Sequence, residues 1–438
     1  MNNSIDLFEN QDYEERIQRN RKYEEIEEDE EEESSSSTSE QGDFPTRLKS
    51  LLKLELVEKF DTAYFAIIIG FAISANICYE FPYPSRWLRI CGIIFFAFAV
   101  FFFLANLSLF IIGCCYHRER IYAYHTDRRK SSFIGAFVMG FITIITFIHH
   151  LVGEKHAIFV WTLWWIAVFL SMYCYVIFYL SYFSKLSKKY TLQDVNFTAI
   201  LLPVTFVVVA SNGETIAPSL PTLELRIVTE LVSLALWSIC CCFGLILIPI
   251  VMLRMMIYKI PDSASVFALF LPIGYVGQLS YFIMLFGKNM SQMIPNHNIA
   301  ESFTVACGLV SFVLMSFGYL LTLLAIGSVL SKIKPFAKTP NPTYSSSKTG
   351  LLVWHKSFWS MNFPIGTMSL ANIEHSRGTV GGYKIEFFRV VSAIYGVALI
   401  LITICNSLGM LHYIYKRCSS LFEIRKNKYK YPSHEQQE

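Results

Sequence analysis

Ten stretches of mostly apolar residues run through the chain, separated by polar connections, and this pattern restricts the fold more than any other feature. The windows cover residues 62–79, 88–113, 131–148, 158–183, 195–211, 228–253, 264–286, 302–330, 357–373 and 388–411. A helix needs about 20 apolar residues to cross the hydrocarbon core of a bilayer. The ionisable residues inside the windows are Arg89, Glu230 and Arg389, each close to a window end. The pattern predicts an all-α integral membrane protein with ten transmembrane helices.

The composition agrees with this prediction and divides the chain into three parts. Hydrophobic residues make up 53% of the sequence and charged residues 16%, with a mean hydropathy of +0.42, whereas soluble domains contain about 25% charged residues. This excludes a soluble enzyme, a secreted disulfide scaffold and a coiled coil. We expect an acidic, disordered cytosolic tail at 1–50, a membrane transporter domain at 51–415, and a basic cytosolic tail at 416–438.

The basic residues predict the orientation. The connections after the even-numbered windows contain 15 Lys and Arg residues, whereas those after the odd-numbered windows contain six. Loops rich in Lys and Arg stay on the cytosolic side. We therefore expect a multi-pass protein with both termini and all even connections in the cytosol.

The odd-numbered windows share an internal repeat. Four of the five are only 17 or 18 residues long, while the even windows have 24 to 29 residues and are almost purely apolar or aromatic. Aligned on a Gly- or Pro-containing core, the odd windows place polar residues six positions after the third core residue, at Asn76, Thr146, Ser211, Ser280 and Asn372. The sequence thus predicts five two-helix repeats, with the odd helices inside and the even helices shielding them from lipid.

Glycine and proline in the inner helices suggest a central pore. Both residues leave backbone groups unpaired, which a membrane tolerates where the backbone lines a cavity or packs in protein. The candidate pore kinks are Gly70, Gly140, Pro203, Pro272, Gly274, Pro364 and Gly366. The five polar residues would supply neutral donors to an anion. The alternative is that Gly and Pro serve tight helix packing while the polar side chains bridge helices.

Four segments resemble the fungal sulfite-efflux branch of the tellurite-resistance/dicarboxylate transporter family, which also contains plant slow anion channels. They are GFAISANICYEFPYPSRWLRI (70–90), LPVTFVVVASNG (202–213), FLPIGYVGQ (270–278) and HKSFWSMNFPIGTMSLAN (355–372). The resemblance spans about residues 58–415 and implies ten helices in five hairpins around a central pore. It implies sulfite or bisulfite export across the plasma membrane, with Phe363 as the pore gate; the driving force considered below then predicts a channel-like or uniport mechanism. Phe363 and Asn372 lie half a turn out of phase, so both face the axis only if the kink resets the phase.

Other functions stay open on the sequence. A malate or dicarboxylate transporter of the same fold would be favoured by paired Arg or Lys, which the inner windows lack. A membrane enzyme is a remote alternative based on His149, His150 and His156. We expect no enzyme activity, cofactor, metal or nucleic-acid partner; the expected partners are a small inorganic anion and the lipid bilayer, and homo-oligomerisation is left open.

Two further expectations concern charge. Four basic residues lie at the ends of spans: Arg86, Arg89, His355 and Lys356. They either concentrate anions at a pore mouth or anchor the helices at the interface.

Proton relays in membranes use acids or histidines within the spans. Because the inner windows contain neither between their ends, the sequence predicts passive transport driven by the membrane potential.

Overall fold

The computed structural model describes residues 57, 60–185, 191–192, 195–261, 266–333, 354–378 and 384–430, with side chains to 416 and at 419. Within these ranges the secondary structure is helical, with no strand, as predicted. The predicted acidic tail at 1–50 and residues 431–438 lie outside them. The last helix, Glu386–Lys430, continues from the membrane domain into the segment that the sequence predicted as a basic tail.

Five buried helices are each followed by a longer helix that packs against them. The buried ones, called inner helices here, are α3 (Phe65–Tyr79), α7 (Ile134–Val152), α9 (Val204–Ile216), α11 (Leu271–Met293) and α13 (Asn362–Ser376). The outer helices are α4 (Arg86–Tyr116), α8 (Ala157–Tyr182), α10 (Leu223–Tyr258), α12 (His297–Leu330) and α14 (Glu386–Lys430). Two short helices, α5 (Glu119–Thr126) and α6 (Arg128–Ser132), lie between the first two pairs. The predicted five two-helix repeats are therefore present.

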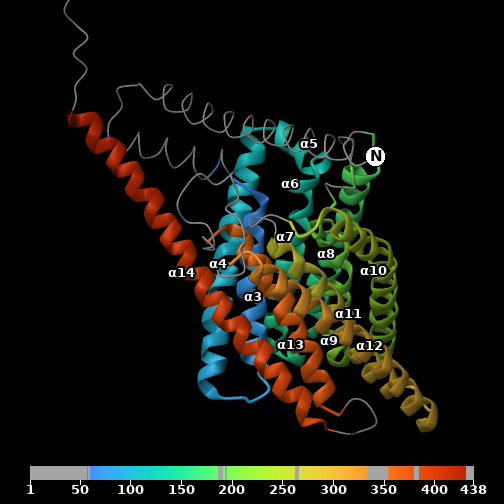
Figure 1. Ribbon diagram of the computed structural model, residues 1–438. Coiled ribbons are helices and arrows are strands. Elements are labelled where there is room, and N and C mark those ends of the chain that lie inside the picture. Colours follow the sequence, from blue (N-terminus) through green and yellow to red (C-terminus); the bar gives the residue numbers. More distant parts are fainter. Residues whose placement is uncertain are drawn as a thin grey trace, which may run out of the picture. The chain divides into compact units, whose positions relative to one another are not determined.

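The inner helices form a closed ring. Each contacts the inner helices of the preceding and following repeats, and α13 returns to contact α3. Figure 1 shows them side by side, with α4, α8, α10, α12 and α14 on the outside. Closure of the ring means that every repeat contributes one helix to the interior.

Burial separates the two sets of helices. In the most apolar windows of the inner helices α3, α7, α9 and α11, between 67% and 100% of residues are buried, against 17% to 39% in the outer helices. Each outer helix leaves large apolar side chains exposed, such as Phe101, Phe169, Leu245, Leu323 and Ile394. In a membrane protein such residues contact lipid, because apolar side chains there replace the polar surface of soluble proteins. The prediction of an inner set shielded by an outer set is confirmed.

Among the described residues, nine helices are long and apolar enough to cross a membrane, and α13 is the tenth member of the pattern. It has 15 residues and a preceding 3₁₀ turn, Lys356–Met361. Every residue from Asn362 to His375 is buried. Because these residues are buried in protein, α13 can cross the interior with a more polar sequence than the other spans.

The prolines begin the inner helices rather than bend them in the middle. Pro203 is the N-cap residue of α9, Pro272 occupies the first turn of α11, and Pro364 is the third residue of α13. Each follows a 3₁₀ segment: Phe197–Leu201, Val266–Phe270 or Lys356–Met361. The missing N–H of proline is tolerated in the first turn, where that group has no partner within the helix. The prolines thus mark the change from 3₁₀ to α-helix.

Candidate functional site

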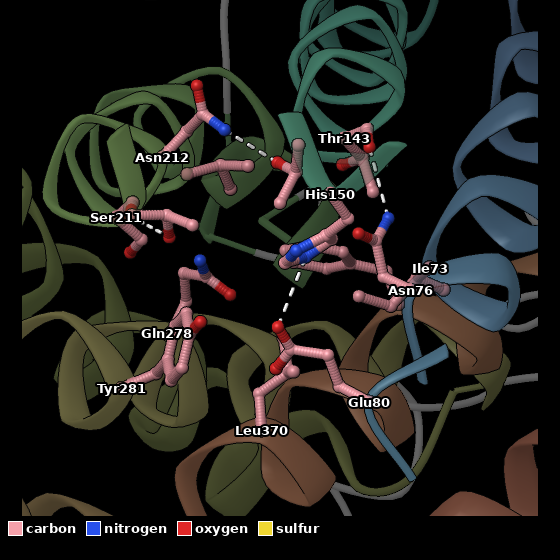
Figure 2. Close-up of a pocket in the computed structure, with 14 residues that line it drawn as sticks. Ile73, Asn76, Glu80, Thr143, His150, Ser211, Asn212, Gln278, Tyr281 and Leu370 are labelled. Carbon is pink, nitrogen blue, oxygen red and sulfur yellow. Dashed lines mark hydrogen bonds and ion pairs between the residues drawn. The ribbon is translucent and has the colours of Figure 1, made fainter. Parts of the chain in front are cut away.

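A small cavity lies inside the ring, and all five inner helices contribute to its wall. Its volume is about 30 Å³. The lining residues are Ile73, Asn76, Glu80, Thr143, Thr146, His150, Val208, Ser211, Asn212, Thr215, Gln278, Tyr281, Phe363 and Leu370. Figure 2 shows their side chains converging from the surrounding helices. The lining contains no lysine or arginine, so its polarity comes mainly from hydroxyl and amide groups.

The Ser and Thr hydroxyl groups of the lining donate to the backbone instead of to the cavity. Thr143 donates to the carbonyl of Met139 at 2.7 Å, and Thr146 to that of Ile142 at 3.0 Å. The other two hydroxyls follow the same i−4 pattern on α9, from Ser211 to Val207 and from Thr215 to Ser211. A hydroxyl has one proton and two lone pairs. These four groups therefore offer acceptors to the cavity, and the expectation that Thr146 and Ser211 supply donors was wrong.

Hydrogen bonds to the backbone also fix the orientation of the Asn76 amide. Its Nδ2 donates to the backbone carbonyls of Ala72, at 2.8 Å, and Thr143, at 3.1 Å. Backbone carbonyls can only accept, so the amide cannot be reversed without losing both bonds. Asn76 Oδ1 is buried and accepts no hydrogen bond from any described residue, and Figure 2 shows this oxygen directed toward the cavity.

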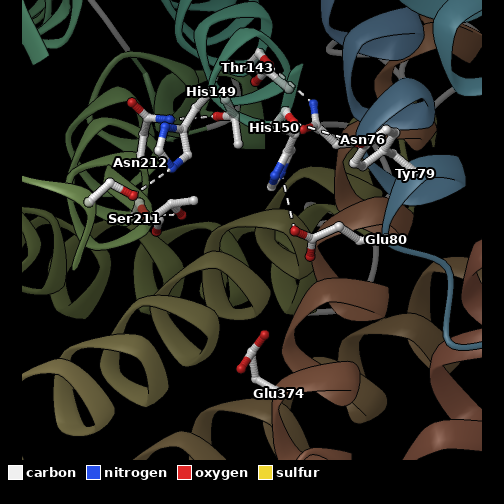
Figure 3. Close-up of polar contacts among 12 residues, drawn as sticks. Asn76, Tyr79, Glu80, Thr143, His149, His150, Ser211, Asn212 and Glu374 are labelled. Carbon is white, nitrogen blue, oxygen red and sulfur yellow. Dashed lines mark hydrogen bonds and ion pairs between the residues drawn. The ribbon is translucent and has the colours of Figure 1, made fainter. Parts of the chain in front are cut away.

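Charged groups lie at the end of the cavity where the inner helices finish. Glu80 is the C-cap of α3, and its Oε1 lies 3.2 Å from Nε2 of His150, in the last turn of α7. Glu80 Oε2 lies 3.4 Å from an Arg377 nitrogen, and Arg377 also pairs with Glu374 of α13. Figure 3 shows Glu80 meeting His150. These ion pairs tie together the ends of α3, α7 and α13, so the Glu80 carboxylate is compensated by nearby positive charge.

Phe363 lines the cavity from the other end, because it lies in the first turn of α13. Its ring packs against α11, where a Cβ added to Gly274 would lie 3.0 Å from Cδ1 of Phe363. The side chain is 7% exposed. A bulky apolar ring thus occupies the cavity wall near the helix starts, and the glycine provides the room for it.

The predicted polar positions divide into two groups. Asn76, Thr146 and Ser211 line the cavity, whereas Ser280 and Asn372 do not. Ser280 pairs with the hydroxyl of Ser311 on α12 at 2.8 Å. The Tyr319 hydroxyl, also on α12, donates to Oδ1 of Asn372 at 2.5 Å.

In α11 the cavity is lined instead by Gln278 and Tyr281, and in α13 by Phe363 and Leu370. Gln278 and Leu370 lie four positions after Gly274 and Gly366. Phe363 and Asn372 therefore face different neighbours, as a helix without a phase reset requires.

The candidate kink glycines are points of close contact between neighbouring inner helices. A Cβ on Gly140 would lie 2.8 Å from the Ile68 side chain of α3, and one on Gly366 would lie 2.4 Å from that of Ile73. A Cβ on Gly70 would lie 2.5 Å from the Trp359 ring. Small residues allow helices in membranes to approach closely. The packing interpretation, left open by the sequence, accounts for these glycines.

The four basic candidates at the span ends have different surroundings. Arg86 and Arg89 are exposed at the start of α4, and the Arg89 guanidinium lies over the Tyr79 ring at 5.6 Å. His355 caps the 3₁₀ turn before α13 by accepting from the backbone N–H of Ser357. Lys356 forms an ion pair with Asp61, at the start of the first repeat, so its charge is compensated in this structure.

Buried acids in the inner helices were missed. The fifth sequence window ends at residue 211, but α9 continues to Ile216 and contains Glu214, which is 1% exposed. Its neighbour across the helix pair is Glu230 of α10, also 1% exposed. Asn289 of α11 donates to Glu214 Oε2 at 3.0 Å. The statement that the inner spans lack acids between their ends was therefore wrong. The sequence Gly-Glu-Thr directly after Asn212 could have indicated this buried acid.

Cavity residues that the sequence did not place in the pore are Glu80, Thr143, His150, Gln278 and Tyr281. Glu80 and His150 were treated as residues of the connections, because hydropathy windows end at the first charged group. His149, from the same candidate histidine cluster, is 8% exposed, and its Nε2 lies 3.4 Å from the Ser219 hydroxyl. His149 and His150 therefore have separate partners.

Comparison with known proteins agrees with this architecture. The family model described as voltage-dependent anion channel matches residues 59–411. The chain therefore belongs to the voltage-dependent anion channel family, an all-α membrane fold.

Within that family the chain is similar to sulfite efflux pumps of fungi. It is 42% identical to the one from Candida albicans over 379 residues, covering 86% of this chain and 78% of the relative. It is 30% identical to the one from Saccharomyces cerevisiae over 423 residues, covering 84% and 92%. The one from Trichophyton rubrum is 24% identical over 353 residues, covering 78% and 88%. The resemblance inferred from the four sequence segments is confirmed.

Proposed function

We propose that this protein exports sulfite, in a channel-like or uniport manner, through a pathway along the axis of the inner ring in the plasma membrane. The observation that carries the proposal is the cavity, because all five inner helices line it and its wall is polar without being strongly charged. The similarity to relatives named as sulfite efflux pumps supports sulfite as the anion.

The membrane potential supplies the driving force in this proposal. A charge crossing the membrane gains about 2.3 kcal/mol per 100 mV. Since the cell interior is negative, an anion is driven outward. The basic connections after the even spans support a cytosolic location for the starts of the inner helices. Phe363 would then close the cavity on the cytosolic side, and the Glu80–His150 pair would lie toward the outside.

Phe363 is the proposed gate for a steric reason. It is the largest apolar side chain of the cavity lining, and it lies at the start of the pathway. A rotation of this ring changes the open cross-section without moving a charge. Gly274, behind the ring, sets how far the ring can withdraw.

A dicarboxylate such as malate is the second candidate on the same fold. Two carboxylates are recognised well by paired Arg or Lys, and none of the lining residues is basic apart from His150. The lack of paired basic residues in the lining favours sulfite.

The test is ion flux from proteoliposomes that contain the full chain, with the membrane potential clamped. Sulfite, malate, chloride and nitrate are compared at equal concentration. We expect voltage-driven sulfite flux that exceeds malate flux. Malate flux equal to or above sulfite flux would assign the protein to the dicarboxylate class, and no flux of any anion above that of empty vesicles would refute the proposal.

A further inference from the structure

The cavity wall carries hydrogen-bond acceptors that the protein holds in fixed directions, which is unexpected for an anion pathway. Four of the five lining hydroxyls use their protons on backbone carbonyls, as described above, and the fifth belongs to Tyr281. Asn76 uses both amide protons on backbone carbonyls, and the amide oxygens of Asn76 and Gln278 accept nothing from the described residues. A ligand in this cavity therefore meets oxygen lone pairs on several sides.

The orientation of these groups is fixed by their partners. Asn212 Nδ2 donates at 2.7 Å to Thr146 Oγ1, and that hydroxyl must accept because its own proton goes to the Ile142 carbonyl. Asn76 donates to two backbone carbonyls, which accept only. The Asn76 amide cannot turn an N–H group into the cavity without losing both bonds, whereas Asn212 keeps a second amide proton beyond its bond to Thr146.

Donors are also present in the lining, at the amide nitrogen of Gln278 and the hydroxyl of Tyr281. His150 directs its Nε2 to Glu80 Oε1, at 3.2 Å. A ligand that satisfies this surface must accept hydrogen bonds on one side and donate one toward Asn76 Oδ1. Leaving a buried acceptor unsatisfied costs about 1–3 kcal/mol.

We infer that the cavity selects anions that carry a proton of their own, so that the transported species is the monoanion bisulfite rather than the sulfite dianion. This inference rests on the proposed function. Bisulfite has a single negative charge, and it offers both acceptor oxygens and one proton that can be donated. The dianion has acceptors only, and its double charge would face the same oxygens.

Bicarbonate and nitrate provide a matched pair of probes. Both are planar, singly charged and built from three oxygens around one central atom, and they differ by the O–H group. Each is added at increasing concentration to proteoliposomes containing the full chain, on the side from which sulfite leaves. We expect bicarbonate to inhibit sulfite flux at a concentration about tenfold lower than nitrate, as one hydrogen bond to a charged ligand predicts.

A variant of Asn76 tests whether its side-chain oxygen causes the preference for bicarbonate over nitrate. Asn76→Leu should bring the bicarbonate and nitrate inhibition constants within about twofold of each other, since the oriented oxygen is gone. The control is Asn372→Leu, which removes an equally buried asparagine that also donates to its i−4 carbonyl but contacts Tyr319 instead of the cavity. It should keep the tenfold preference in whatever flux it retains. If Asn76→Leu fails to reach the membrane, Gln278→Leu removes another cavity oxygen, with the same expected loss of preference.

The outcomes separate the two proposals. Sulfite flux in which nitrate competes as well as bicarbonate overturns the inference and leaves sulfite export standing. Loss of the preference in Asn372→Leu to the same extent as in Asn76→Leu also overturns it. Absence of sulfite flux from the unaltered protein refutes the proposed function itself.

Discussion

The ring of Phe363 packs directly against Gly274, so that a methyl group added to the glycine would lie 3.0 Å from Cδ1 of the ring and 3.1 Å from Cα of Pro364. The two residues belong to neighbouring repeats, on α13 and α11. The position of the proposed gate is therefore set by the adjacent helix as well as by its own.

Gly274→Ala should push the ring and the start of α13 away from α11. We expect a loss of thermal stability worth about 1–3 kcal/mol and reduced sulfite flux, both measured on the purified protein. Adding Phe363→Ala should restore part of the stability, because the ring is one of the two groups in contact. The control is Gly327→Ala on α12, where no atom lies within 4 Å of the added Cβ. Additive losses in the double variant would contradict the contact.

Phe363→Ala alone should raise basal anion flux several-fold at equal amounts of protein. The change opens volume in the cavity wall without adding a charge. Because truncating a buried Phe costs about 3–5 kcal/mol in soluble cores, surface level and monodispersity must be measured together with flux. Phe169→Ala, on a side chain of α8 that is 69% exposed, serves as the control. Unchanged flux at a normal surface level would refute a gating role.

The Asp61–Lys356 pair links the first and last repeats, and its contribution should depend on pH. Burial by itself raises the pKa of the Asp61 carboxyl, but Lys356 and the Ala63 backbone N–H outweigh it, and the pKa falls below the ordinary value of 3.8. A carboxyl whose pKa is lowered by folding stabilises the folded state above its unfolded value and loses that effect as the pH falls through the folded value.

Asp61→Asn should therefore lower the melting temperature in detergent at neutral pH, and the difference from the unaltered protein should shrink below about pH 4. The exchanged pair Asp61→Lys with Lys356→Asp should recover part of the loss. A melting difference that stays constant across this range would show that the substitution acts through packing alone.

The predicted orientation can be tested at two exposed connections, Lys259 after α10 and Asn296 before α12. An epitope inserted at residue 296 should label in intact cells, and one at residue 259 only after permeabilisation. This follows from the bias of Lys and Arg toward the even connections. Labelling of both epitopes in intact cells would refute the topology.

Glu214 and Glu230 give the passive mechanism its sharpest test, because buried acids in membrane helices are the usual components of proton relays. With passive transport, flux follows the clamped voltage and ignores an imposed pH gradient. Glu214→Gln and Glu230→Gln should then retain that voltage dependence, as should Glu301→Gln at an exposed site of α12. Flux that follows the pH gradient and loses this response in Glu214→Gln would establish proton coupling instead.

The sequence by itself determined the membrane fold, the pairing of short inner with long outer helices, and the family. These depend on hydropathy and on spacing along one chain, which a lipid environment enforces strongly. It also placed Asn76, Thr146, Ser211 and Phe363 among residues that prove to line the cavity.

Only the tertiary structure decided which way individual side chains face. Ser280 and Asn372 occupy the repeat position of Ser211, yet they bond to α12, because helix rotation is set by partners such as Ser311 and Tyr319. The spacing of residues along a helix fixes their angles relative to one another, but the absolute rotation is fixed by packing between helices. The same holds for hydrogen-bond polarity: a sequence contains the Asn76 amide, and only the carbonyls of Ala72 and Thr143 decide that its oxygen faces the cavity.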